Sequence, residues 1–304
     1  MSSSIPKFKL NDGNEIPSLG YGLGTANFKR KNSPPFDEQI VSATLTALGV
    51  GYHHLDGAEA YGNESELGAA IQQSNLPRSS LFVTTKTSCR QGETIEQAFS
   101  RSLQKLNLDY VDLYLIHSPF FADASPEVLR KKWSEMEAIK DSGRAKSIGV
   151  SNFLQEHLEA IIENNPDLKY RPSINQIEYH PYLQHITPEA GDLLEYHKKH
   201  GIVVEAYSPL TVVTKARGGP VDPVYEELAS KYQVGEGEIA LRWCLDQGIV
   251  AVTTSSSQER LEGWLKRVFS FKLTDEETKR ISEEGRKKNY RGYWNAKLGS
   301  DDWR

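Results

Sequence analysis

The chain has 304 residues, 38% of them hydrophobic and 25% charged, which is an ordinary composition for a globular protein with a large core. Its 36 Lys and Arg residues and 41 Asp and Glu residues give a net charge of −5, the wrong sign for a protein that covers nucleic-acid phosphates. These figures exclude disordered, collagen-like and disulfide-scaffold proteins, and we expect no nucleic-acid partner.

The two cysteines, Cys89 and Cys244, lie far apart and outside any metal-ligand pattern, so we expect reduced thiols in a cytoplasmic protein. The first residues lack the apolar core of a secretion signal. No window approaches about 20 consecutive apolar residues, so we expect no membrane-spanning segment.

Residues Phe8–Pro17 are typical of a short hairpin whose turn is Asn11-Asp12-Gly13. After it, β-rich runs alternate with amphipathic stretches at a mean spacing of about 33 residues, which is close to one strand–helix unit each. The predicted strands are Leu19–Gly24, Gly51–Asp56, Leu81–Lys86, Val111–His117, Ala145–Val150, Ser173–Glu178, Ile202–Tyr207 and Ile249–Thr254.

The segments between these runs have helical periodicity. Apolar residues recur every three or four positions in Glu96–Leu106 and in Glu127–Lys140, the pattern of one buried helix face. We expect left-handed glycine caps before four of the strands, at Gly49, Gly143, Gly201 and Gly248.

Sequential strand–helix–strand connections impose parallel pairing, and eight repeats favour closure of the sheet on itself. We therefore predict an α/β fold, a (β/α)8 TIM barrel over residues 1–304 as a single domain. The N-terminal hairpin and a C-terminal tail over the barrel mouth complete the prediction.

Polar residues directly follow several of the apolar strands, at the end of the barrel where such folds assemble their sites. Lys86 ends one strand, and Asp56 ends the preceding one at matching depth. A buried ammonium needs a partner, so a structural ion pair is one explanation. Tyr61 supports another, since an ammonium held by a carboxylate would lower the pKa of the phenol and let it protonate a developing alkoxide.

His117 ends the next strand and could orient a carbonyl oxygen by a hydrogen bond; the alternative is a core histidine with satisfied hydrogen bonds. His53 and His54 raise a rival metal hypothesis. Adjacent strand residues point to opposite faces, so these two cannot both bind one interior metal, and we predict no metal site.

Two segments could contact phosphates. Gly20–Gly24 resembles a dinucleotide loop, but Thr25 stands where its third glycine is required, so we expect only close backbone approach there. Residues Thr253–Arg260 combine hydroxyls, a helix N-terminus and a guanidinium, which favours an anion site; a simple serine cap is the alternative.

Five segments together resemble the aldo-keto reductase family, in the right order within residues 8 to 285. They are Gly51–Gly68, Val111–Pro119, Ile148–Phe153, Asn175–Tyr182 and Ala206–Leu210. The run Val-Thr-Thr-Ser-Ser at 252–256, the run His117–Phe121 and the block Leu273–Glu277 are most similar to the fungal ketoamide and conjugated-polyketone (ketopantoyl-lactone) reductases.

This resemblance implies a monomeric barrel that reduces carbonyls with NADPH by direct hydride transfer, with Asp56, Tyr61, Lys86 and His117 as the catalytic residues and Tyr61 as general acid. It places Ser151, Asn152 and Gln176 against the nicotinamide carboxamide and Tyr207 against its ring. Ser208 and Leu210 fall at the pyrophosphate, and Ser255 and Arg260 at the adenosine 2′-phosphate. Gly24, Thr25, Asp56, Thr254 and Ser256 complete the expected cofactor site.

The chain also departs from the family pattern. Thr254 stands where many relatives have lysine, which removes a charge-assisted contact, and Gly263 and Trp264 stand where adenine-contacting residues are usual. Ala26 replaces a substrate-pocket tryptophan. Gly57 replaces a threonine without loss of a catalytic group.

Aromatic residues of the loops and tail are candidates for the substrate walls. We predict Phe28, Phe120, Phe121 and Trp294 as substrate-binding residues, with Tyr293 and Trp303 as further candidates. Such a cleft suits α-ketoamides, α-ketolactones or diketones. The tail could instead only pack on the barrel rim. A functional alternative is a nucleotide-sensing module on the same fold, like the potassium-channel β subunits.

Overall fold

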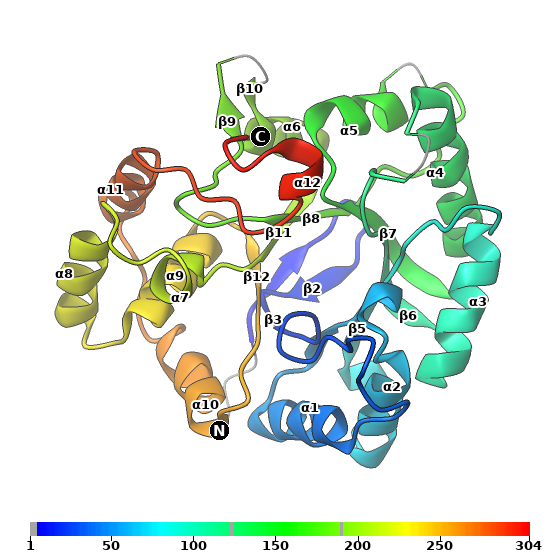
Figure 1. The fold of residues 1–304 in the computed structure, drawn as a ribbon, viewed down its shortest axis with the longest axis horizontal. Coiled ribbons are helices and arrows are strands. Elements are labelled where there is room, and N and C mark those ends of the chain that lie inside the picture. The colour runs from blue at the N-terminus through cyan, green and yellow to red at the C-terminus, as the bar shows by residue number, and fades with distance from the viewer. Residues whose placement is uncertain (1–4, 122–123, 164, 189–190) are drawn as a thin grey trace.

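Eight parallel strands close into a barrel in the computed structural model, which describes residues 5–121, 124–163, 165–188 and 191–304 (Figure 1). In hydrogen-bonded order they are β11 (Val203–Tyr207), β12 (Val250–Thr253), β3 (Leu19–Gly22), β4 (His54–Asp56), β5 (Phe82–Thr87), β6 (Val111–Ile116), β7 (Ala145–Ser151) and β8 (Ile174–Glu178). Each lies within one or two residues of a predicted run, except β4, which begins three residues later. The predicted TIM barrel is confirmed.

Helices surround the strands. They are α1 (Glu38–Val50), α2 (Glu64–Gln73), α3 (Ile95–Leu106), α4 (Pro126–Asp141), α5 (Gln155–Ile162), α6 (Leu193–His200), α7 (Thr211–Thr214), α8 (Asp222–Tyr232), α9 (Glu236–Asp246), α10 (Gln258–Arg267), α11 (Asp275–Gly285) and α12 (Asn295–Leu298), with 3-10 turns η1 (Glu59–Tyr61) and η2 (Arg78–Ser80). Figure 1 shows most of the helices as a ring outside the barrel, while the short α12 belongs to the C-terminal tail.

Local capping sets the ends of several helices. The Thr94 side chain accepts from the N–H of Gln97 in a capping box at α3, and Ser125 caps α4. The left-handed cap predicted at Gly49 is wrong, because Gly49 lies inside α1 and Gly51, at φ +117°, ends that helix. Gly143, Gly201 and Gly248 have the predicted positive φ.

The predicted N-terminal hairpin, β1 (Lys7–Lys9) with β2 (Glu15–Pro17), closes one end of the barrel. Leu10 and Ile16 are buried in a cluster with side chains from the barrel strands, among them Phe82 and Leu113. A second pair of short antiparallel strands, β9 (Ile186–Thr187) and β10 (Gly191–Asp192), was not predicted, because two-residue strands carry no readable alternation.

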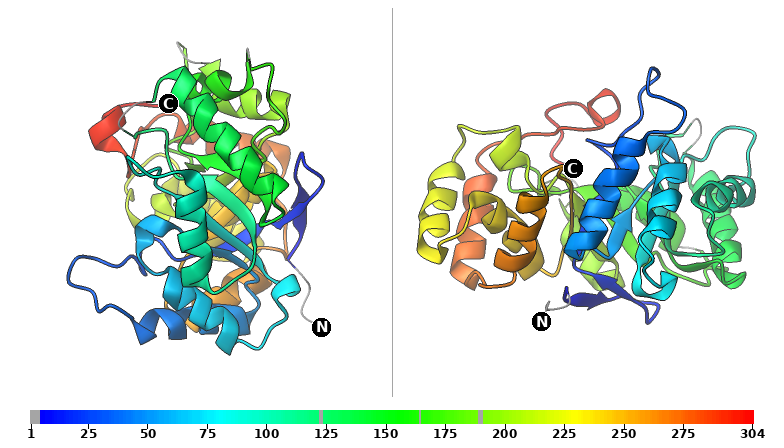
Figure 2. Two further views of the ribbon diagram at one scale, coloured as in Figure 1. Left: turned by 90° about the vertical axis from the view of Figure 1, so that its right-hand side faces the viewer. Right: turned by 90° about the horizontal axis from the view of Figure 1, so that it is seen from below.

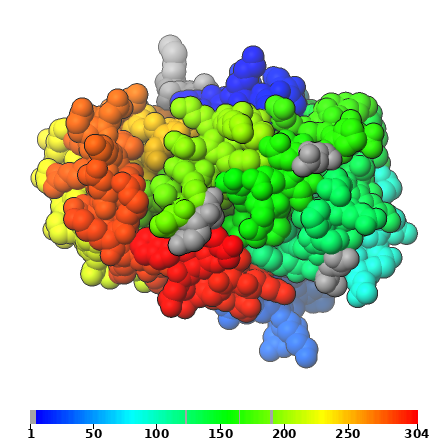
Figure 3. Space-filling model, turned by 90° about the horizontal axis from the view of Figure 1, so that it is seen from above, coloured from blue at the N-terminus to red at the C-terminus, as the bar shows by residue number. Residues whose placement is uncertain are grey.

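The C-terminal tail lies at the opposite end of the barrel from the hairpin (Figure 2, right). Figure 3 shows it in red, lying across the molecular surface beside the α11 segment in orange. The Glu178 carboxylate at the end of β8 anchors it by accepting from the backbone N–H groups of Gly292, at 2.8 Å, and Tyr293, at 3.1 Å. The tail therefore covers the end where the strands present their carboxyl termini.

Candidate active site

The Lys86 ammonium lies at the centre of the polar end of the barrel. Strand alternation turns this β5 side chain inward, where it is fully buried. Its Nζ lies 2.7 Å from Asp56 Oδ1, 2.8 Å from the Gly57 carbonyl oxygen and 3.3 Å from the Tyr61 hydroxyl. Burial disfavours the charge, but the Asp56 carboxylate more than compensates and raises the pKa of Lys86. Lys86 is therefore a cation.

The Tyr61 hydroxyl is aimed at this ammonium by the short η1 turn that follows β4. Its ring packs against Phe28, with centroids 6.0 Å apart, and edge-on against His117, at 5.6 Å. Gly24 leaves room for the phenol, since a Cβ there would lie 3.2 Å from the Tyr61 ring. Backbone geometry and packing thus fix the phenol between the ammonium and the cleft.

The pKa of Tyr61 moves in the direction opposite to our expectation. Burial raises it above the usual value of 10, and the neighbouring Lys86 charge only limits that rise. The prediction of a net lowered pKa is therefore wrong, because loss of hydration outweighs one ammonium. The phenol stays protonated at neutral pH, which is the state an acid needs before it gives up its proton.

His117 follows β6 and is held by its backbone. Its N–H donates to the Thr87 carbonyl, and its own carbonyl accepts from the Asn152 side-chain amide, both at 2.9 Å. Burial, together with the Lys86 charge, lowers the pKa of His117 to about 3. A neutral imidazole therefore lies beside Tyr61, available as a hydrogen-bond donor or acceptor.

The ends of β7, β8 and β11 form a connected polar wall. Tyr207 donates its hydroxyl proton to Asn152 Oδ1 at 2.8 Å, and Asn152 adopts a left-handed φ of +61° to face it. The Ser151 hydroxyl donates to the backbone carbonyl oxygen of Gln176 at 2.8 Å. The Gln176 amide donates to Asp56 Oδ1 at 2.9 Å, which joins this wall to the Lys86 site.

A cleft of about 660 Å³ opens above these groups. Fourteen predicted site residues line it: Gly24, Thr25, Phe28, Asp56, Tyr61, His117, Ser151, Asn152, Gln176, Tyr207, Ser208, Leu210, Thr254 and Trp294. Tyr293, also named from the sequence, lines it as well. Lys86 lies beneath the cleft wall rather than on it, because Tyr61 and Asp56 cover its ammonium.

A second cleft of about 640 Å³ continues the first, since Leu210, Thr214 and Thr254 line both. Arg260 lies at its far part, on α10. The Ser257 side chain caps that helix by accepting from the N–H of Arg260 at 3.2 Å, so the serine cap that was the alternative to an anion site exists. Ser255 is buried just before it, and Ser256 is exposed.

The aromatic candidates divide into two groups. Phe28 and Trp294 face the cleft, whereas Phe120 does not line it and packs on Trp294 with centroids 5.2 Å apart. Phe121 packs against the hydrophobic core. Trp303 is partly buried outside the cleft. The tail therefore packs on the rim and also contributes Tyr293 and Trp294 to the cleft wall, and their role in substrate binding stays a prediction.

Residues 21–285 match the sequence model of the Aldo/keto reductase family. The chain belongs to this family. It is 38% identical over 252 residues to the NAD/NADP-dependent indole-3-acetaldehyde reductase of Schizosaccharomyces pombe, covering 82% of this chain and 85% of that one. It is 37% identical over 303 residues to the NADPH-dependent alpha-keto amide reductase of Saccharomyces cerevisiae, covering 96% and 95%.

A solved aldo/keto reductase from Brucella melitensis has the same fold, with a TM-score of 0.77 and 36% sequence identity over 92% of this chain and 99% of that one. Family membership and fold thus agree over nearly the whole chain. The resemblance found in the sequence motifs is confirmed at the family level.

Several residues of this aldo/keto reductase site were missed from the sequence. Lys215 lines the cleft and donates to the Tyr293 hydroxyl at 3.0 Å, and Arg217 and Arg267 line the second cleft. Loop conformation places Lys215 and Arg217, Arg267 ends α10, and no local pattern signals that the three reach the clefts. Glu205, buried beneath Gln176, could have been found as a charged residue inside the apolar run Ile202–Tyr207.

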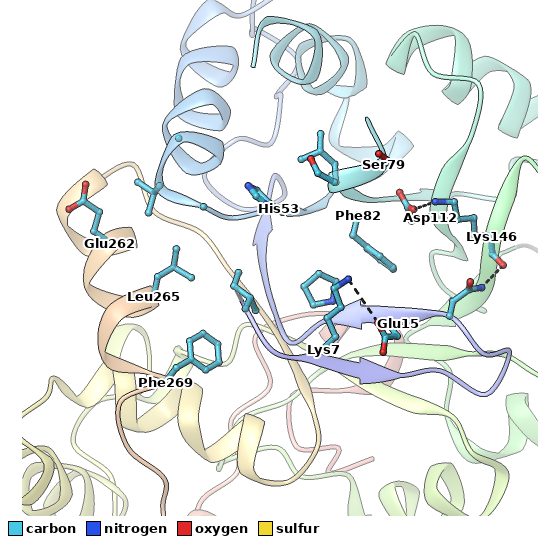
Figure 4. Close-up of a pocket in the computed structure, with 18 of the residues that line it drawn as sticks. Lys7, Glu15, His53, Ser79, Phe82, Asp112, Lys146, Glu262, Leu265 and Phe269 are labelled. Carbon is cyan, nitrogen blue, oxygen red and sulfur yellow. Dashed lines mark hydrogen bonds and ion pairs between the residues drawn. The ribbon is translucent and has the colours of Figure 1, made fainter. Parts of the chain in front are cut away.

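A larger groove, of about 1250 Å³, lies at the hairpin end of this aldo/keto reductase (Figure 4). Its charges neutralise one another: Lys7 lies 4.0 Å from Glu15, and Lys146 lies 2.8 Å from Asp112. His53 lines this groove, while His54 is buried in the barrel, so the adjacent histidines diverge as the strand alternation predicts.

Within the described ranges, no group of three or more His, Cys, Asp and Glu side chains is arranged to hold a metal ion. In the same ranges, no helix combines the length and apolarity needed to cross a membrane.

Proposed function

We propose that this aldo/keto reductase reduces aldehydes or activated ketones to alcohols with NADPH, by direct hydride transfer, with Tyr61 as the general acid. One observation carries the proposal: the Tyr61 hydroxyl lies 3.3 Å from a fully buried Lys86 ammonium and lines the cleft beside a neutral His117. The named activities of the two yeast relatives support both the cofactor and the reaction class.

The two connected clefts fit a dinucleotide. Gln176, Asn152 and Tyr207 lie at the end near Tyr61 and offer an amide and an aromatic face to a nicotinamide. Arg260 lies at the other end, where its guanidinium suits a 2′-phosphate. NADPH, when bound, supplies the hydride that reduces the carbonyl carbon.

Side chains of the protein then donate the proton and stabilise the charge that develops on the oxygen atoms. Tyr61 and His117 converge on the position of the carbonyl oxygen, where both can hydrogen-bond to it. As that oxygen gains negative charge, the Lys86 ammonium stabilises the phenolate that forms when Tyr61 gives up its proton. Asp56 keeps Lys86 charged throughout, at an Oδ1–Nζ distance of 2.7 Å.

The aromatic wall supports a preference for planar, activated carbonyls of the α-ketoamide, α-ketolactone or diketone type. Phe28, Tyr293 and Trp294 bring three rings to the cleft. Flat apolar surfaces of this kind pack on conjugated dicarbonyl substrates, while Tyr61 and His117 address the single reacting oxygen.

We further propose that the enzyme acts as a cytoplasmic monomer on small molecules. The two cysteines are free, buried thiols, in keeping with a reducing compartment. Sedimentation should give the chain mass of 34.2 kDa, and twice that mass would refute the monomer.

The proposed function is tested by following NADPH absorbance with purified protein and a panel of α-ketoamides, α-ketolactones, diketones and aldehydes. Turnover with dicarbonyls is the expected result. Tight NADPH binding without turnover of any panel member would instead support a nucleotide-sensing module, and absence of both would refute the proposal.

A further inference from the structure

Gln176 is held by carboxyl groups from two other strands. Its Nε2 donates to Asp56 Oδ1 and to Glu205 Oε2, each at 2.9 Å. The strand register places Glu205 directly beside Gln176 on β11, so both side chains enter the barrel interior at one level. All three side chains are at most 3% exposed.

This arrangement fixes the orientation of the Gln176 amide. An amide has two donor hydrogens on nitrogen and an acceptor oxygen, and here both hydrogens are used by carboxyl oxygens. A flipped amide would set its carbonyl oxygen against two acceptors, leaving unmade hydrogen bonds at a buried site. The Oε1 carbonyl is therefore left to the cleft, whose wall Gln176 forms.

Glu205 faces His54 in the barrel interior. Glu205 Oε1 lies 3.4 Å from His54 Nε2; both atoms are fully buried, and within the described residues neither makes a hydrogen bond to any other group. His54 Nδ1 lies 3.3 Å from the Pro17 carbonyl oxygen. Gly20 makes space for this ring, since a Cβ there would lie 2.7 Å from His54 Nδ1.

The position of the proton follows from these contacts. The Pro17 carbonyl can only accept, so the hydrogen of the neutral His54 ring is on Nδ1 and its Nε2 is an acceptor. The facing Oε1 of Glu205 then carries the proton, and Oε2 stays free to accept from Gln176. Burial, reinforced by the Asp56 charge, raises the pKa of Glu205 to about 8, and burial lowers that of His54 to about 4, in agreement with two neutral groups.

We propose that Glu205 is a positioning residue, a neutral acid that locks the Gln176 amide so that its Oε1 accepts from the carboxamide NH2 of the nicotinamide. This inference rests on the proposed function, since it assumes that a nicotinamide dinucleotide binds in the cleft. Glu205, which does not itself touch the cofactor, thereby determines how Gln176 recognises the carboxamide NH2 of the nicotinamide.

The test compares two dinucleotides by fluorescence-monitored binding: NADP+, and its 3-acetylpyridine analogue, which has a methyl group in place of the carboxamide NH2. Glu205→Leu removes the acceptor for Gln176, so it should weaken NADP+ binding by about tenfold, the size of one hydrogen bond. Binding of the analogue should change less than about twofold.

Glu205→Gln is the matched control, because its amide imitates the neutral acid by donating to His54 Nε2 and accepting from Gln176. It should keep the wild-type affinity for both dinucleotides. The threonine side chain of Glu205→Thr is too short to reach Gln176, so this variant should also lose affinity for NADP+ but not for the analogue. It replaces Glu205→Leu in the test if the leucine variant does not fold.

Equal losses for both dinucleotides would overturn the positioning role, as would an unchanged NADP+ affinity in Glu205→Leu and Glu205→Thr. Failure of the wild-type protein to bind either dinucleotide would overturn the proposed function itself, so the two failures are distinguishable.

Discussion

At the scale of single residues, two arginines that line the second cleft differ in whether their side chains have a carboxylate partner. Arg217 is paired with Glu236 at 2.5 Å, while Arg260 is exposed at the start of α10, and within the described residues only its backbone N–H is engaged, by the Ser257 cap. An arginine without a carboxylate partner keeps its guanidinium donors for a bound anion. Arg260 is therefore the residue that we expect to distinguish NADPH from NADH.

Arg260→Ala should weaken NADPH binding by about 10- to 100-fold, the size of a charge-assisted hydrogen bond, and leave NADH binding almost unchanged. Titration of both cofactors into the variant measures this difference. Arg217→Ala is the matched control and should lose far less. Equal loss of both cofactors in Arg260→Ala would place the 2′-phosphate elsewhere.

Candidate site residues could be located from the sequence where they lie at or near the carboxyl end of a predicted strand. Residues such as Lys86 and Gln176 were found because parallel strands bring their carboxyl ends to one face. Lys215 was not found, because its neighbour Tyr293 comes from a distant segment whose conformation no local pattern specifies, and the buried charge of Glu205 within an apolar run was overlooked. The sign of the Tyr61 pKa shift also needed the structure, since burial cannot be quantified from sequence.

At the scale of elements, the attachment of the C-terminal tail depends on one carboxylate at the end of β8. Besides the Gly292 and Tyr293 N–H groups, Glu178 contacts His180 Nε2 at 3.2 Å. Gly292 is required for this approach, since a Cβ there would lie 2.9 Å from Glu178 Oε1. The tail rings at the cleft are therefore positioned from the barrel itself.

Glu178→Ala should release the tail, since it leaves two backbone donors without acceptors at about 1–3 kcal/mol each. We expect faster tryptic cleavage after Arg291 and a KM for aromatic dicarbonyls raised several-fold, with a smaller change in kcat. The exposed Glu227, paired with Arg280 at 2.7 Å, provides the control Glu227→Ala. Unchanged cleavage and KM would refute the anchoring role.

Most elements were predictable because their signals are local. The hairpin turn, the strand alternation and the apolar faces of α3 and α4 each lie within a dozen or so residues. The failures have the same explanation: β9 and β10 are too short to show alternation, and Gly49 and Gly51 lie two residues apart, so sequence alone did not select the cap.

At the scale of the whole molecule, burial of histidine couples folding to pH. Burial is the main cause that lowers the pKa of four imidazoles, to about 4 for His54 and His185 and about 3 for His117 and His197. The unfolded chain binds protons at these rings below pH about 6.5, whereas the native protein does not. Unfolding therefore takes up protons as the pH falls.

The free energy of unfolding should decrease between pH about 6.5 and 5, by about 1.4 kcal/mol per pH unit for each such imidazole. Glu205 offsets the contribution of one imidazole to this pH dependence. Its pKa is raised to about 8, so the native state keeps a proton that the unfolded chain releases above pH about 4.5. Urea unfolding at several pH values measures the slope.

His197 offers a direct check of this slope. It accepts from Asn175 Nδ2 at 2.9 Å, and the side-chain carbonyl of His197→Gln can accept in the same way. That variant should make the pH dependence of the unfolding free energy shallower by the contribution of one proton. A free energy of unfolding that stays constant from pH 7 to 5 would contradict the linkage.

The central claim is that Tyr61 donates the proton, and the turnover of Tyr61→Phe tests it most directly. Phenylalanine keeps the ring contacts with Phe28 and His117 and removes only the hydroxyl beside Lys86. We predict a fall in kcat of about 10²- to 10⁴-fold with NADPH affinity within about twofold of wild type, while Tyr293→Phe retains activity. A Tyr61→Phe enzyme that keeps most of its turnover would contradict the account.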